Sequence, residues 1–369
     1  MKIVFIGGRD IHKLGGIEAY MYNLCTELVK LGVEPLVYCE SDRDEIETLN
    51  GFTVIHQKSI NSRFWTKPIL GLKAIKRTLK EHPDIDVYHF NAGGPAYFGW
   101  IARLCGKRTI YQGHGIEWRR TKWSPFHRLI MQFTNMYVVV FCTKYATAVS
   151  EEQTEMLWKR YRKKCKTINC AVNLPQSVKN DTVLDRFGLR GKKYFLYLGR
   201  LVQDKNPDFL IKAFNTSGSE DWKLVIAGSN DSAPEYVNYL KELAKGNNRI
   251  IFTGAVYGDD KETLMANCGT FCIPSTIEGL SITLLEAMSY GRICIASDIQ
   301  ANKEALAENA IWVKAEDLES LKSALKRVML NYDVLKLSGK KNYQRVIEHF
   351  TWPKVAKEYY EMVCEITKK

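Results

Sequence analysis

The sequence predicts an α/β protein made of two doubly wound domains. Short apolar segments alternate with helical segments from Lys2 onward, which is the pattern of a parallel sheet covered by helices on both faces. The alternation stops in the polar stretch Ser177–Gly191 and restarts at Lys193. A chain of 369 residues is also long for a single hydrophobic core. We therefore expect two tandem Rossmann-like domains facing each other across a cleft, with ligands bound beyond the carboxyl ends of the strands.

The first expected domain covers residues 1–175. Its strands are short runs rich in β-branched and aromatic residues, and its helices carry apolar residues three and four positions apart. The expected strands are Lys2–Gly7, Glu34–Cys39, Phe52–Gln57, Asp86–Phe90 and Arg108–Gln112. The expected helices are Ile17–Leu31, Trp65–Glu81, Pro95–Cys105 and the apolar run Leu129–Phe141, for which we expect a buried core helix. The amphipathic C-terminal helix, within residues 351–369, is expected to cross back to this domain.

The second expected domain covers residues 176–350, with Ser177–Gly191 as the linker. The same alternation of apolar strands and amphipathic helices predicts its elements. The expected strands are Lys193–Leu198, Lys223–Ala227, Arg249–Thr253, Gly269–Ile273, Arg292–Ala296 and Ala310–Val313. The expected helices are Pro207–Phe214, Pro234–Lys245, Asp260–Asn267 and Ile299–Leu306.

Composition narrows the class of protein. Hydrophobic residues make up 46% of the chain and charged residues 25%, as in ordinary soluble globular proteins. No run of about 18 apolar residues predicts a membrane-spanning helix, and Met1–Gly8 fits a first buried strand better than a signal peptide. Ten scattered cysteines without a CxxC pair indicate reduced thiols in a cytoplasm and argue against disulfides or a zinc site. The net charge of +12 favours an anionic partner, which is nucleic acid, an anionic membrane or a phosphorylated substrate.

The stretch Pro274–Met288 has the pattern of a strand end, a tight loop and a helix start. Gly279 and the two residues after it offer backbone N–H groups where the helix begins, and such a helix start is well suited to bind a phosphate. The carboxylates of Glu278 and Glu286 can accept hydrogen bonds from sugar hydroxyls. The loop therefore suits a ligand that is both anionic and polyhydroxylated, such as a nucleotide sugar. Thr283-x-x-Glu286 also fits a capping box, so a purely structural role for Glu286 stays open.

Other polar residues also follow predicted strands. Arg200 and Lys205 come after the strand Lys193–Leu198, where a guanidinium can fork onto two phosphate oxygens and an ammonium can add a point charge. His114 follows another strand and stands between two glycines, which favours a functional role over a surface role. The Gly15-Gly16 turn allows a close approach of backbone to phosphate or sugar.

These motifs together resemble glycosyltransferase family 4, whose members have the GT-B architecture of two facing Rossmann-like domains. The resemblance runs over nearly the whole chain and is carried by a set of motifs in order. They are Gly15-Gly16-Ile17-Glu18, Ala148-Val149-Ser150-Glu151, Gly199-Arg200-Leu201 with Lys205, Val225-Ile226-Ala227-Gly228, and Pro274-Ser275 with Glu278-Gly279-Leu280 and Leu285-Glu286-Ala287-Met288. A narrower resemblance, at Gly113–Trp123, is to rhamnosyltransferases of bacterial surface polysaccharides.

The resemblance and the strand ends together supply candidate residues for each part of a sugar transfer. For catalysis at the transferred sugar they are His114 and Glu278. For the donor diphosphate they are Arg200, Lys205, Gly16, Leu280 and Ser281, and for the donor sugar and ribose they are Gly279 and Glu286. For the nucleobase they are Gly228, Val256 and Tyr257, and for the acceptor they are Gly15, Glu117 and Arg119. Glu18 is expected to be a helix N-terminal charge.

The resemblance implies a retaining enzyme that uses a nucleotide-sugar donor, with rhamnose from dTDP-rhamnose as the best candidate. It implies no metal and no other cofactor, because the cations and amides can hold the leaving diphosphate. The expected acceptor is a lipid-diphosphate-linked oligosaccharide in the synthesis of a bacterial capsule, O-antigen or exopolysaccharide. We expect a front-face mechanism, in which the leaving phosphate helps to deprotonate the acceptor.

Two basic clusters predict a membrane surface as a further partner. Lys159–Lys166 places six cations among eight residues, and Trp118–Arg128 mixes cations with aromatic residues. Cations beside aromatic side chains suit anionic lipid headgroups. We therefore expect a cytoplasmic protein bound peripherally to the inner face of the plasma membrane.

Two other functions fit parts of the sequence. A nucleotide-sugar epimerase shares the GT-B scaffold and would release product without an acceptor. A nucleic-acid-binding protein would explain the charge of +12, but the chain shows no recognisable binding module and no regular base-stacking aromatics. We expect no nucleic-acid partner.

Overall fold

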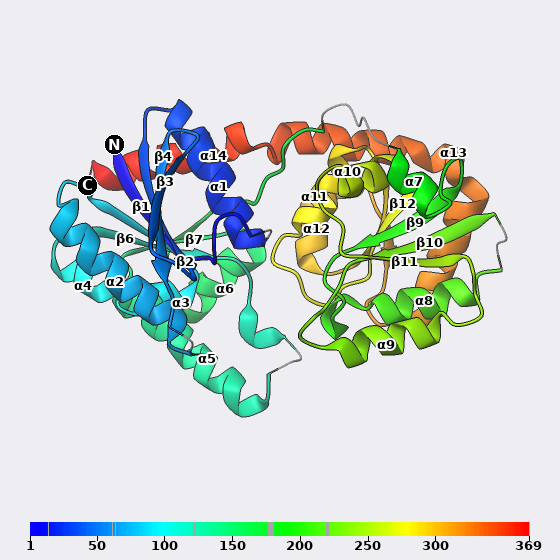
Figure 1. Ribbon diagram of the computed structural model, residues 1–369, viewed down its shortest axis with the longest axis horizontal. Helices are drawn as coiled ribbons and strands as arrows, with labels where there is room; N and C mark the ends of the chain where they lie inside the picture. The colour runs from blue at the N-terminus through cyan, green and yellow to red at the C-terminus, as the bar shows by residue number, and fades with distance from the viewer. Residues whose placement is uncertain are drawn as a thin grey trace. The chain divides into compact units, whose positions relative to one another are not determined.

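The computed structural model describes residues 1–13, 15–60, 62, 64–120, 123–175, 181–218 and 221–368. The chain divides into two compact units, shown in Figure 1. Unit 1 comprises Met1–Ala171 and Trp352–Lys369, and unit 2 comprises Val172–Thr351. Each unit has its own mainly parallel sheet with helices on both faces, so the predicted α/β class is confirmed.

The sheet of unit 1 has eight strands in the order β3-β4-β2-β1-β5-β6-β7-β8. The strands are β1 Lys2–Ile6, β2 Glu34–Ser41, β3 Glu45–Leu49, β4 Phe52–Lys58, β5 Val87–Asn91, β6 Arg108–Gly113, β7 Tyr145–Ala148 and β8 Cys165–Thr167. All neighbouring strands are parallel except β3, which pairs antiparallel with β4. Strands β3, β7 and β8 were not predicted. The residues of β3 are mostly polar, as an exposed edge strand allows, and β7 and β8 are only four and three residues long.

Helices cover both faces of this sheet. They are α1 Gly16–Lys30, α2 Thr66–Glu81, α3 Gly93–Ala96, α4 Gly99–Leu104, the 3₁₀ turn η1 Glu117–Arg119, α5 Pro125–Tyr137, the π-helical turn η2 Val138–Cys142, α6 Glu151–Tyr161 and α14 Trp352–Thr367. In Figure 1, α1 and α14 lie on one face and α2, α3 and α4 on the other. Arg108 donates hydrogen bonds to the carbonyls of Ile366 and Thr367, which satisfies two of the free carbonyl groups at the end of α14.

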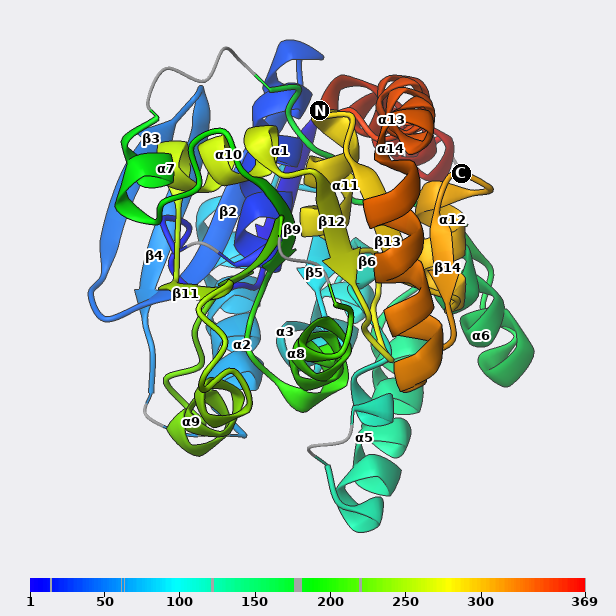
Figure 2. The same ribbon diagram turned by 90° about the vertical axis from the view of Figure 1, so that its right-hand side faces the viewer.

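Two predicted helices of unit 1 are wrong. The single helix Pro95–Cys105 is instead the pair α3 and α4, because Phe98 leaves helical geometry (φ −103°, ψ 15°). This break accompanies the packing of Tyr97 against Tyr137, with ring centroids 5.1 Å apart. The run Leu129–Phe141 is not a buried core helix, since no residue of α5 is buried and the first buried residue of the run is Val138. Figures 1 and 2 both show α5 at the margin of unit 1, away from its sheet.

The sheet of unit 2 has six parallel strands in the order β11-β10-β9-β12-β13-β14. The strands are β9 Lys193–Leu198, β10 Trp222–Ala227, β11 Ile250–Gly254, β12 Thr270–Ile273, β13 Ile293–Ser297 and β14 Ile311–Val313. The helices are α7 Thr182–Arg186, η3 Gln203–Lys205, α8 Pro207–Asn215, α9 Pro234–Leu243, α10 Gly258–Asn267, α11 Ile282–Ser289, α12 Gln300–Leu306 and α13 Leu318–His349, which kinks at Asn331. Aromatic and aliphatic residues from β9, β10, α8 and α13 form its core on one face.

The predicted linker Ser177–Gly191 is shorter in the structure than in the sequence analysis. Residues 176–180 lie outside the described residues. Beyond them, Thr182–Arg186 forms α7, which packs on α10 within unit 2 and buries Val183 and Leu184. The polar composition of this stretch hid the helix, because only these two side chains face the core.

Candidate functional site

Unit 2 has a topological switch point at the carboxyl ends of β9 and β12. The chain leaves β9 toward β10 on one side of the sheet centre and enters β12 on the other, so the strand order reverses between these two neighbours. Ligands of open α/β sheets bind in the crevice that such a reversal creates. The loops that follow β9 and β12 contain Arg200, Lys205 and Glu278, so the structure brings these predicted residues to one edge of the sheet.

Lys205 and Glu278 form an ion pair at this switch point. The Lys205 Nζ lies 2.8 Å from Glu278 Oε1, and the two side chains are 18% and 10% exposed. Ser275 Oγ donates to the same carboxylate oxygen at 2.7 Å. A largely buried ion pair with an added hydrogen bond has one geometry, unlike a surface pair. The pair therefore presents a positioned cation and carboxylate to any ligand at this edge.

Hydrogen bonds from neighbouring segments hold the loop that carries Glu278. Ser297, at the end of β13, donates a hydrogen bond to the carbonyl of Ser275 and accepts one from Asn302 Nδ2 at 3.0 Å. On the other side, Asn206 donates to the carbonyl of Pro274 at 3.0 Å, and the Thr276 amide donates to the carbonyl of Asp204 at 2.9 Å. These bonds tie the loops after β9, β12 and β13 into one rigid support.

The start of α11 lies next to the ion pair. Its N-cap is Ser281, whose side chain accepts a hydrogen bond from the Leu284 amide at 3.4 Å. The predicted capping box of Thr283 and Glu286 is therefore wrong, because the helix begins two residues before that motif requires. Among the described residues, the amides of Gly279 and Leu280 have no hydrogen-bond acceptor within the protein. They are available to an anion at the positive end of the helix dipole.

Glu286 has a partner that the sequence analysis missed. Lys261 Nζ, on α10, lies 2.7 Å from Glu286 Oε1, and the two side chains are about one quarter exposed. The carboxylate keeps its second oxygen for another donor, as a role in binding hydroxyls would require. Nothing in the sequence singles out Lys261 among 53 basic residues, since the contact depends on how α10 packs beside α11.

Gly199 and Gly228 bring the ends of β9 and β10 into close contact. A Cβ atom on Gly228 would lie 1.9 Å from the carbonyl oxygen of Gly199, and the φ of Gly228 is +153°. The Leu201 amide then donates to the carbonyl of Ser229 at 3.2 Å. This contact sets the start of the loop on which Arg200 is exposed, so the predicted nucleobase residue Gly228 has a clear structural role.

The two other predicted nucleobase residues follow β11. Val256 is half-buried and Tyr257 is 57% exposed at the start of α10. β11 is the edge strand, two positions from β9 in the sheet. The structure therefore places them at the carboxyl edge of the sheet but farther along it than the Lys205–Glu278 pair.

In unit 1, His114 lies at the carboxyl end of β6 beside the end of β5. Its Nε2 is 3.1 Å from Asn91 Oδ1, and its ring packs edge-on against Tyr20 at 5.0 Å. Because a carbonyl oxygen can only accept, this contact is a hydrogen bond in the tautomer with the proton on Nε2, in which Nδ1 is an acceptor. Burial lowers the pKa of His114 to about 3. The imidazole is therefore neutral at physiological pH, which suits hydrogen bonding better than proton abstraction.

The buried histidine His89 makes unit 1 sensitive to acid. His89 on β5 is fully buried against Tyr359 of α14, with 2.9 Å between His89 Nδ1 and the Tyr359 hydroxyl. Burial, with a smaller contribution from His114, lowers the pKa of His89 to about 3. In the unfolded chain a histidine has a pKa of about 6.5, so the unfolded state binds the proton first as the pH falls.

We expect stability to be complete above pH about 6.5 and to fall below it, at a rate of about 1.4 kcal/mol per pH unit for a buried histidine. Urea unfolding at a series of pH values between 7 and 5 measures this slope. His89→Gln removes one of the titrating groups and should make the slope shallower by that amount. An unchanged slope in the variant would show that His89 is already protonated or solvated in the folded state.

The Gly15-Gly16 turn at the start of α1 is tightly packed. Glu18 is buried and accepts a hydrogen bond from the Arg9 amide at 2.6 Å, and a Cβ on Gly15 would lie 2.0 Å from Glu18 Oε2. Glu18 therefore holds the loop after β1 rather than standing free at the helix end. A side chain at position 15 would therefore displace the Glu18 carboxylate from its hydrogen bond with the Arg9 amide, whether or not the predicted acceptor role holds.

The loop after β1 also contributes Asp10 and His12 to a group of polar side chains that was not predicted, together with Glu47 of β3 and His56 of β4. Donor atoms of Asp10, His12 and His56 lie within 4.8 Å of one another. Glu47 Oε1 lies 2.8 Å from His12 Nε2 and 2.5 Å from His56 Nε2. The hydrogen bonds between Glu47 and both histidines, with Asp10 Oδ1 3.8 Å from His56 Nδ1, explain the group as a brace between the loop after β1 and the edge of the sheet.

The two remaining acceptor candidates lie on η1, three and five residues after His114. Glu117 pairs with Arg120 at 2.7 Å and accepts a hydrogen bond from the Trp123 indole at 3.3 Å. Arg119 pairs with Glu152 of α6. The structure thus places both on the loop that follows β6, at the same edge of the sheet as His114, and gives both a partner inside unit 1.

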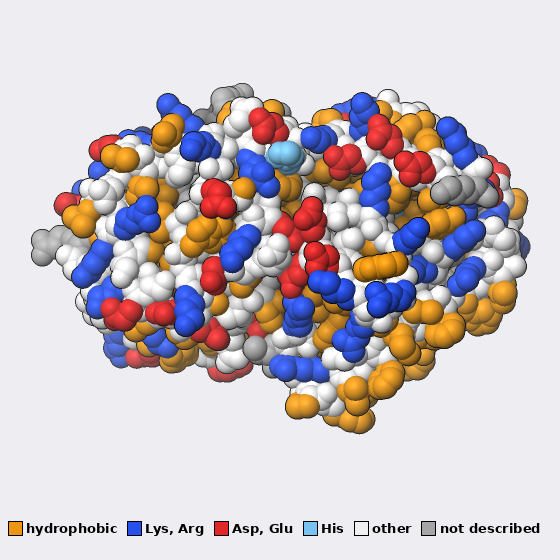
Figure 3. All heavy atoms as spheres, turned by 180° about the vertical axis from the view of Figure 1, so that it is seen from behind, with side chains coloured by type: hydrophobic (Ala, Val, Ile, Leu, Met, Phe, Trp, Pro, Cys, Tyr) orange, Lys and Arg blue, Asp and Glu red, His pale blue; other side chains and the backbone are white. Residues whose placement is uncertain are grey.

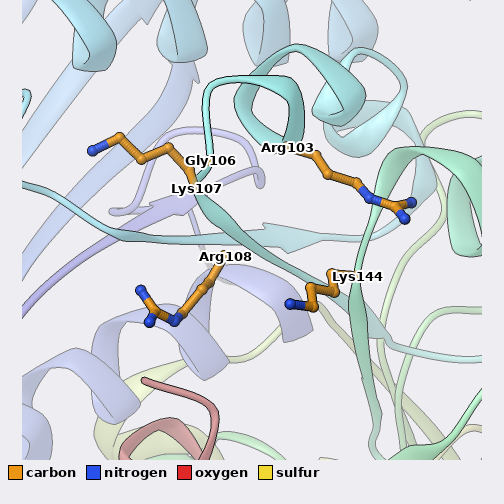
Figure 4. A pocket seen from close by; sticks show the side chains of 5 residues that line it. All are labelled: Arg103, Gly106, Lys107, Arg108 and Lys144. Atoms are coloured by element: carbon orange, nitrogen blue, oxygen red, sulfur yellow. The ribbon is translucent and has the colours of Figure 1, made fainter. Parts of the chain in front are cut away.

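Unit 1 also has a basic pocket at the opposite edge of its sheet. Arg103, Gly106, Lys107, Arg108 and Lys144 line it. Arg108 begins β6 and Lys144 precedes β7, so the pocket lies at the amino ends of the strands, far from His114. Figure 4 shows the side chains of Arg103 and Lys144 to the right of the chain at Gly106 and the side chain of Lys107 to its left. The cations therefore do not converge on one point. This pocket contains none of the predicted site residues.

Two known protein families match this chain, one in each of its two halves. The family described as Glycosyltransferase Family 4 matches residues 14–176, and the family described as Glycosyl transferases group 1 matches residues 184–351. An uncharacterized glycosyltransferase of Methanocaldococcus jannaschii is 30% identical over 367 residues, which cover 94% of this chain and 93% of that protein.

Two relatives with named activities are less similar. The UDP-Gal:alpha-D-GlcNAc-diphosphoundecaprenol alpha-1,3-galactosyltransferase of Escherichia coli is 25% identical and covers 77% of this chain and 76% of its own length. A GDP-mannose-dependent alpha-(1-6)-phosphatidylinositol monomannoside mannosyltransferase of Mycolicibacterium smegmatis is 25% identical, with coverage of 75% of each.

Solved structures extend the likeness in fold. The sucrose-phosphate synthase of Thermosynechococcus elongatus superposes with a TM-score of 0.84 at 17% identity, and the match covers all of both chains. The two family matches, the full-length relative and this fold agree with one another. The chain therefore belongs to the glycosyltransferases, with the GT-B fold and an N-terminal unit of family 4.

Proposed function

We propose that this glycosyltransferase moves a sugar from a nucleoside-diphosphate donor to a lipid-diphosphate-linked oligosaccharide in bacterial surface polysaccharide synthesis, with retention at the anomeric carbon. Rhamnose from dTDP-rhamnose is the donor to test first, because of the resemblance at Gly113–Trp123. The observation that carries the proposal is the Lys205–Glu278 pair beside the free amides at the start of α11. It combines a cation, a carboxylate and anion-binding amides at one switch point.

In this proposal the residues of unit 2 bind the donor. Lys205, Arg200 and the amides of Gly279, Leu280 and Ser281 stabilise the charge that develops on the departing diphosphate. Glu278 orients Lys205 and accepts hydrogen bonds from hydroxyls of the transferred sugar. Glu286 binds the ribose hydroxyls with its free carboxylate oxygen. These groups supply the positive charge that a metal ion would otherwise provide, so the proposed transfer needs no metal and no cofactor.

His114 acts in this proposal as a positioning group at the sugar. A neutral imidazole with a pKa of about 3 is too weak a base to take a proton from an alcohol efficiently. Its free Nδ1 can instead accept a hydrogen bond from a sugar hydroxyl. The leaving phosphate then deprotonates the acceptor on the same face of the sugar. This mechanism predicts that the anomeric configuration is retained, which the NMR spectrum of the product measures.

The proposed lipid-linked acceptor and the proposed membrane location of the protein rest on different observations. The two relatives with named activities act, by their names, on diphosphoundecaprenol-linked and phosphatidylinositol-linked substrates. The basic cluster Lys159–Lys166 lies at the end of α6 and on β8, with several of its side chains exposed. No helix in the described part of the chain is long and apolar enough to cross a bilayer. We propose peripheral binding to the inner face of the plasma membrane.

The proposed donor is tested by thermal shift with UDP, GDP and dTDP and with their sugars. A ligand at about 100 times its Kd should stabilise the protein by about 2.7 kcal/mol, and one nucleotide should give a clearly larger shift than the others. Product formation is then followed with the selected donor, with and without a lipid-diphosphate oligosaccharide. Sugar release that does not depend on the acceptor, or no shift with any nucleoside diphosphate, would overturn the proposed function.

A further inference from the structure

We propose that α5 is the membrane-binding element of this protein and lies flat in the interface of an anionic bilayer, with its apolar stripe among the lipid chains. The proposal deepens the proposed function, on whose lipid-linked acceptor its purpose rests. Three features support the proposal: the exposed apolar face of the helix, its contacts with unit 1 and the cations near it.

The apolar stripe of α5 faces away from unit 1. Its members recur three and four residues apart, which is the period of one helix face. They are Phe126, Leu129, Ile130, Phe133 and Met136, and they are between 37% and 69% exposed. The stripe spans about 15 Å at 1.5 Å per residue, and Phe141, 58% exposed, continues it beyond the helix. A contiguous apolar surface of this kind marks a binding site in a folded protein.

The side of α5 that contacts unit 1 carries polar side chains, beside Tyr137, which packs on the core of the unit. Asn135 Nδ2 donates to the Tyr111 hydroxyl at 3.1 Å. Arg160 donates to Gln132 Oε1 at 2.5 Å. These hydrogen bonds hold the helix on unit 1 in one orientation, so the stripe cannot turn inward to join the core. The helix is thus built to present apolar side chains outward.

The charges around the apolar stripe indicate what binds to it. The segment from Pro125 to Phe141 contains no acidic residue. At the end of the stripe, Arg103 donates to the carbonyls of Val140 and Phe141, and Lys144 shares its basic pocket. Lys163 lies near this end, where burial, aided by the positive charge of Arg103, lowers its pKa to about 8. An apolar stripe bordered by cations matches the chains and headgroups of an anionic bilayer.

The surface view supports the same arrangement. Figure 3 shows hydrophobic side chains gathered at the lower end of unit 1, where α5 lies, with Lys and Arg side chains beside them. A second copy of the chain is a poorer occupant, because two basic faces would meet and the net charge of each chain is +12.

The position of α5 connects membrane binding to the reaction. The helix follows directly on the loop that begins at His114 and carries η1. A bilayer that accepts the stripe therefore lies along the segment next to the predicted acceptor residues. An acceptor whose sugar is fixed to a lipid diphosphate would reach this loop without leaving the membrane surface.

Vesicle flotation of the full chain tests the proposal. The vesicles are phosphatidylcholine alone or phosphatidylcholine with phosphatidylglycerol, at low and raised salt. We expect flotation with the anionic vesicles, and the double variant F126S/F133S should lower the partition coefficient at least tenfold. The matched control is I46S/L330S, which replaces two exposed apolar side chains on β3 and α13 and should bind within about twofold of the wild type.

Further measurements separate the possible failures. The nucleotide-induced thermal shift of F126S/F133S should equal that of the wild type, which shows an intact fold and donor site whatever happens to membrane binding. Equal flotation of this variant and the wild type would overturn the assignment of α5, as would absence of flotation by the wild type. Sedimentation in which the wild type forms dimers and F126S/F133S does not, without vesicle binding by either, would assign the stripe to a second copy.

Discussion

Lys205→Ala is expected to lower kcat/KM by about 10³-fold, because the ammonium stabilises charge that forms on the diphosphate only as the sugar departs. The loss should fall mainly on kcat, since charge in the transition state exceeds charge in the bound donor. Arg200→Ala should act in the same direction. Steady-state transfer assays with the donor selected by thermal shift measure both.

The Lys205→Ala effect must be separated from a loss of structure. The substitution leaves the Glu278 carboxylate, 10% exposed, with Ser275 as its remaining partner, which we expect to cost about 1–3 kcal/mol. The double variant K205A/E278Q removes that unpaired charge and should recover stability without recovering turnover. The matched control is Lys212→Ala, a lysine of the same unit that pairs with Asp208 at 3.0 Å on α8 and should retain wild-type kinetics. Wild-type turnover in Lys205→Ala would refute its role at the diphosphate.

Gly228→Ala is expected to lower the melting temperature by about 10 °C and to abolish the thermal shift with nucleotide. The new Cβ would stand 1.9 Å from the carbonyl oxygen of Gly199, and backbone atoms on both strands would have to move. That movement displaces the start of the loop that carries Arg200. Circular dichroism melting with and without nucleotide measures the two effects together.

The control for Gly228 separates collision from backbone strain. Gly246 also has a positive φ, +83°, but a Cβ there would meet no atom within 4 Å. Gly246→Ala therefore carries only the strain of the left-handed conformation, about 1–2 kcal/mol, and should keep the nucleotide shift. Equal losses in the two variants would show that the contact between Gly199 and Gly228 contributes nothing of its own.

Local patterns in the sequence were sufficient to predict five of the eight strands of the first sheet and all six strands of the second, but not β3, β7 and β8 or the helices α6 and α13. The period of apolar residues indicates whether a segment is a strand or a helix, and glycine and proline mark where it ends. Because parallel strands end at one edge, the positions of Arg200, Lys205, Glu278 and His114 directly after strands also predicted their edge of each sheet. These inferences need only neighbours in the chain.

Contacts between distant segments were decided by the tertiary structure alone. Lys205 and Glu278 are 73 residues apart and Lys261 and Glu286 are 25 apart, so neither pair can be chosen from composition or spacing. The low pKa of His114 likewise depends on what surrounds its ring in the folded unit. Such properties belong to packing and desolvation, which no single segment contains.

The helix α5 shows most clearly where sequence reasoning ends. Its apolar stripe was visible in the chain, and burial was the natural expectation for it. A helical period shows that apolar residues share a face but not which way that face points. A hydrogen bond from Asn135 to Tyr111 and one from Arg160 to Gln132 fix the opposite face inward, and the stripe is left exposed. The sequence by itself determined the helix and its stripe, whereas the direction of the stripe depended on side chains from other segments that pack beneath it.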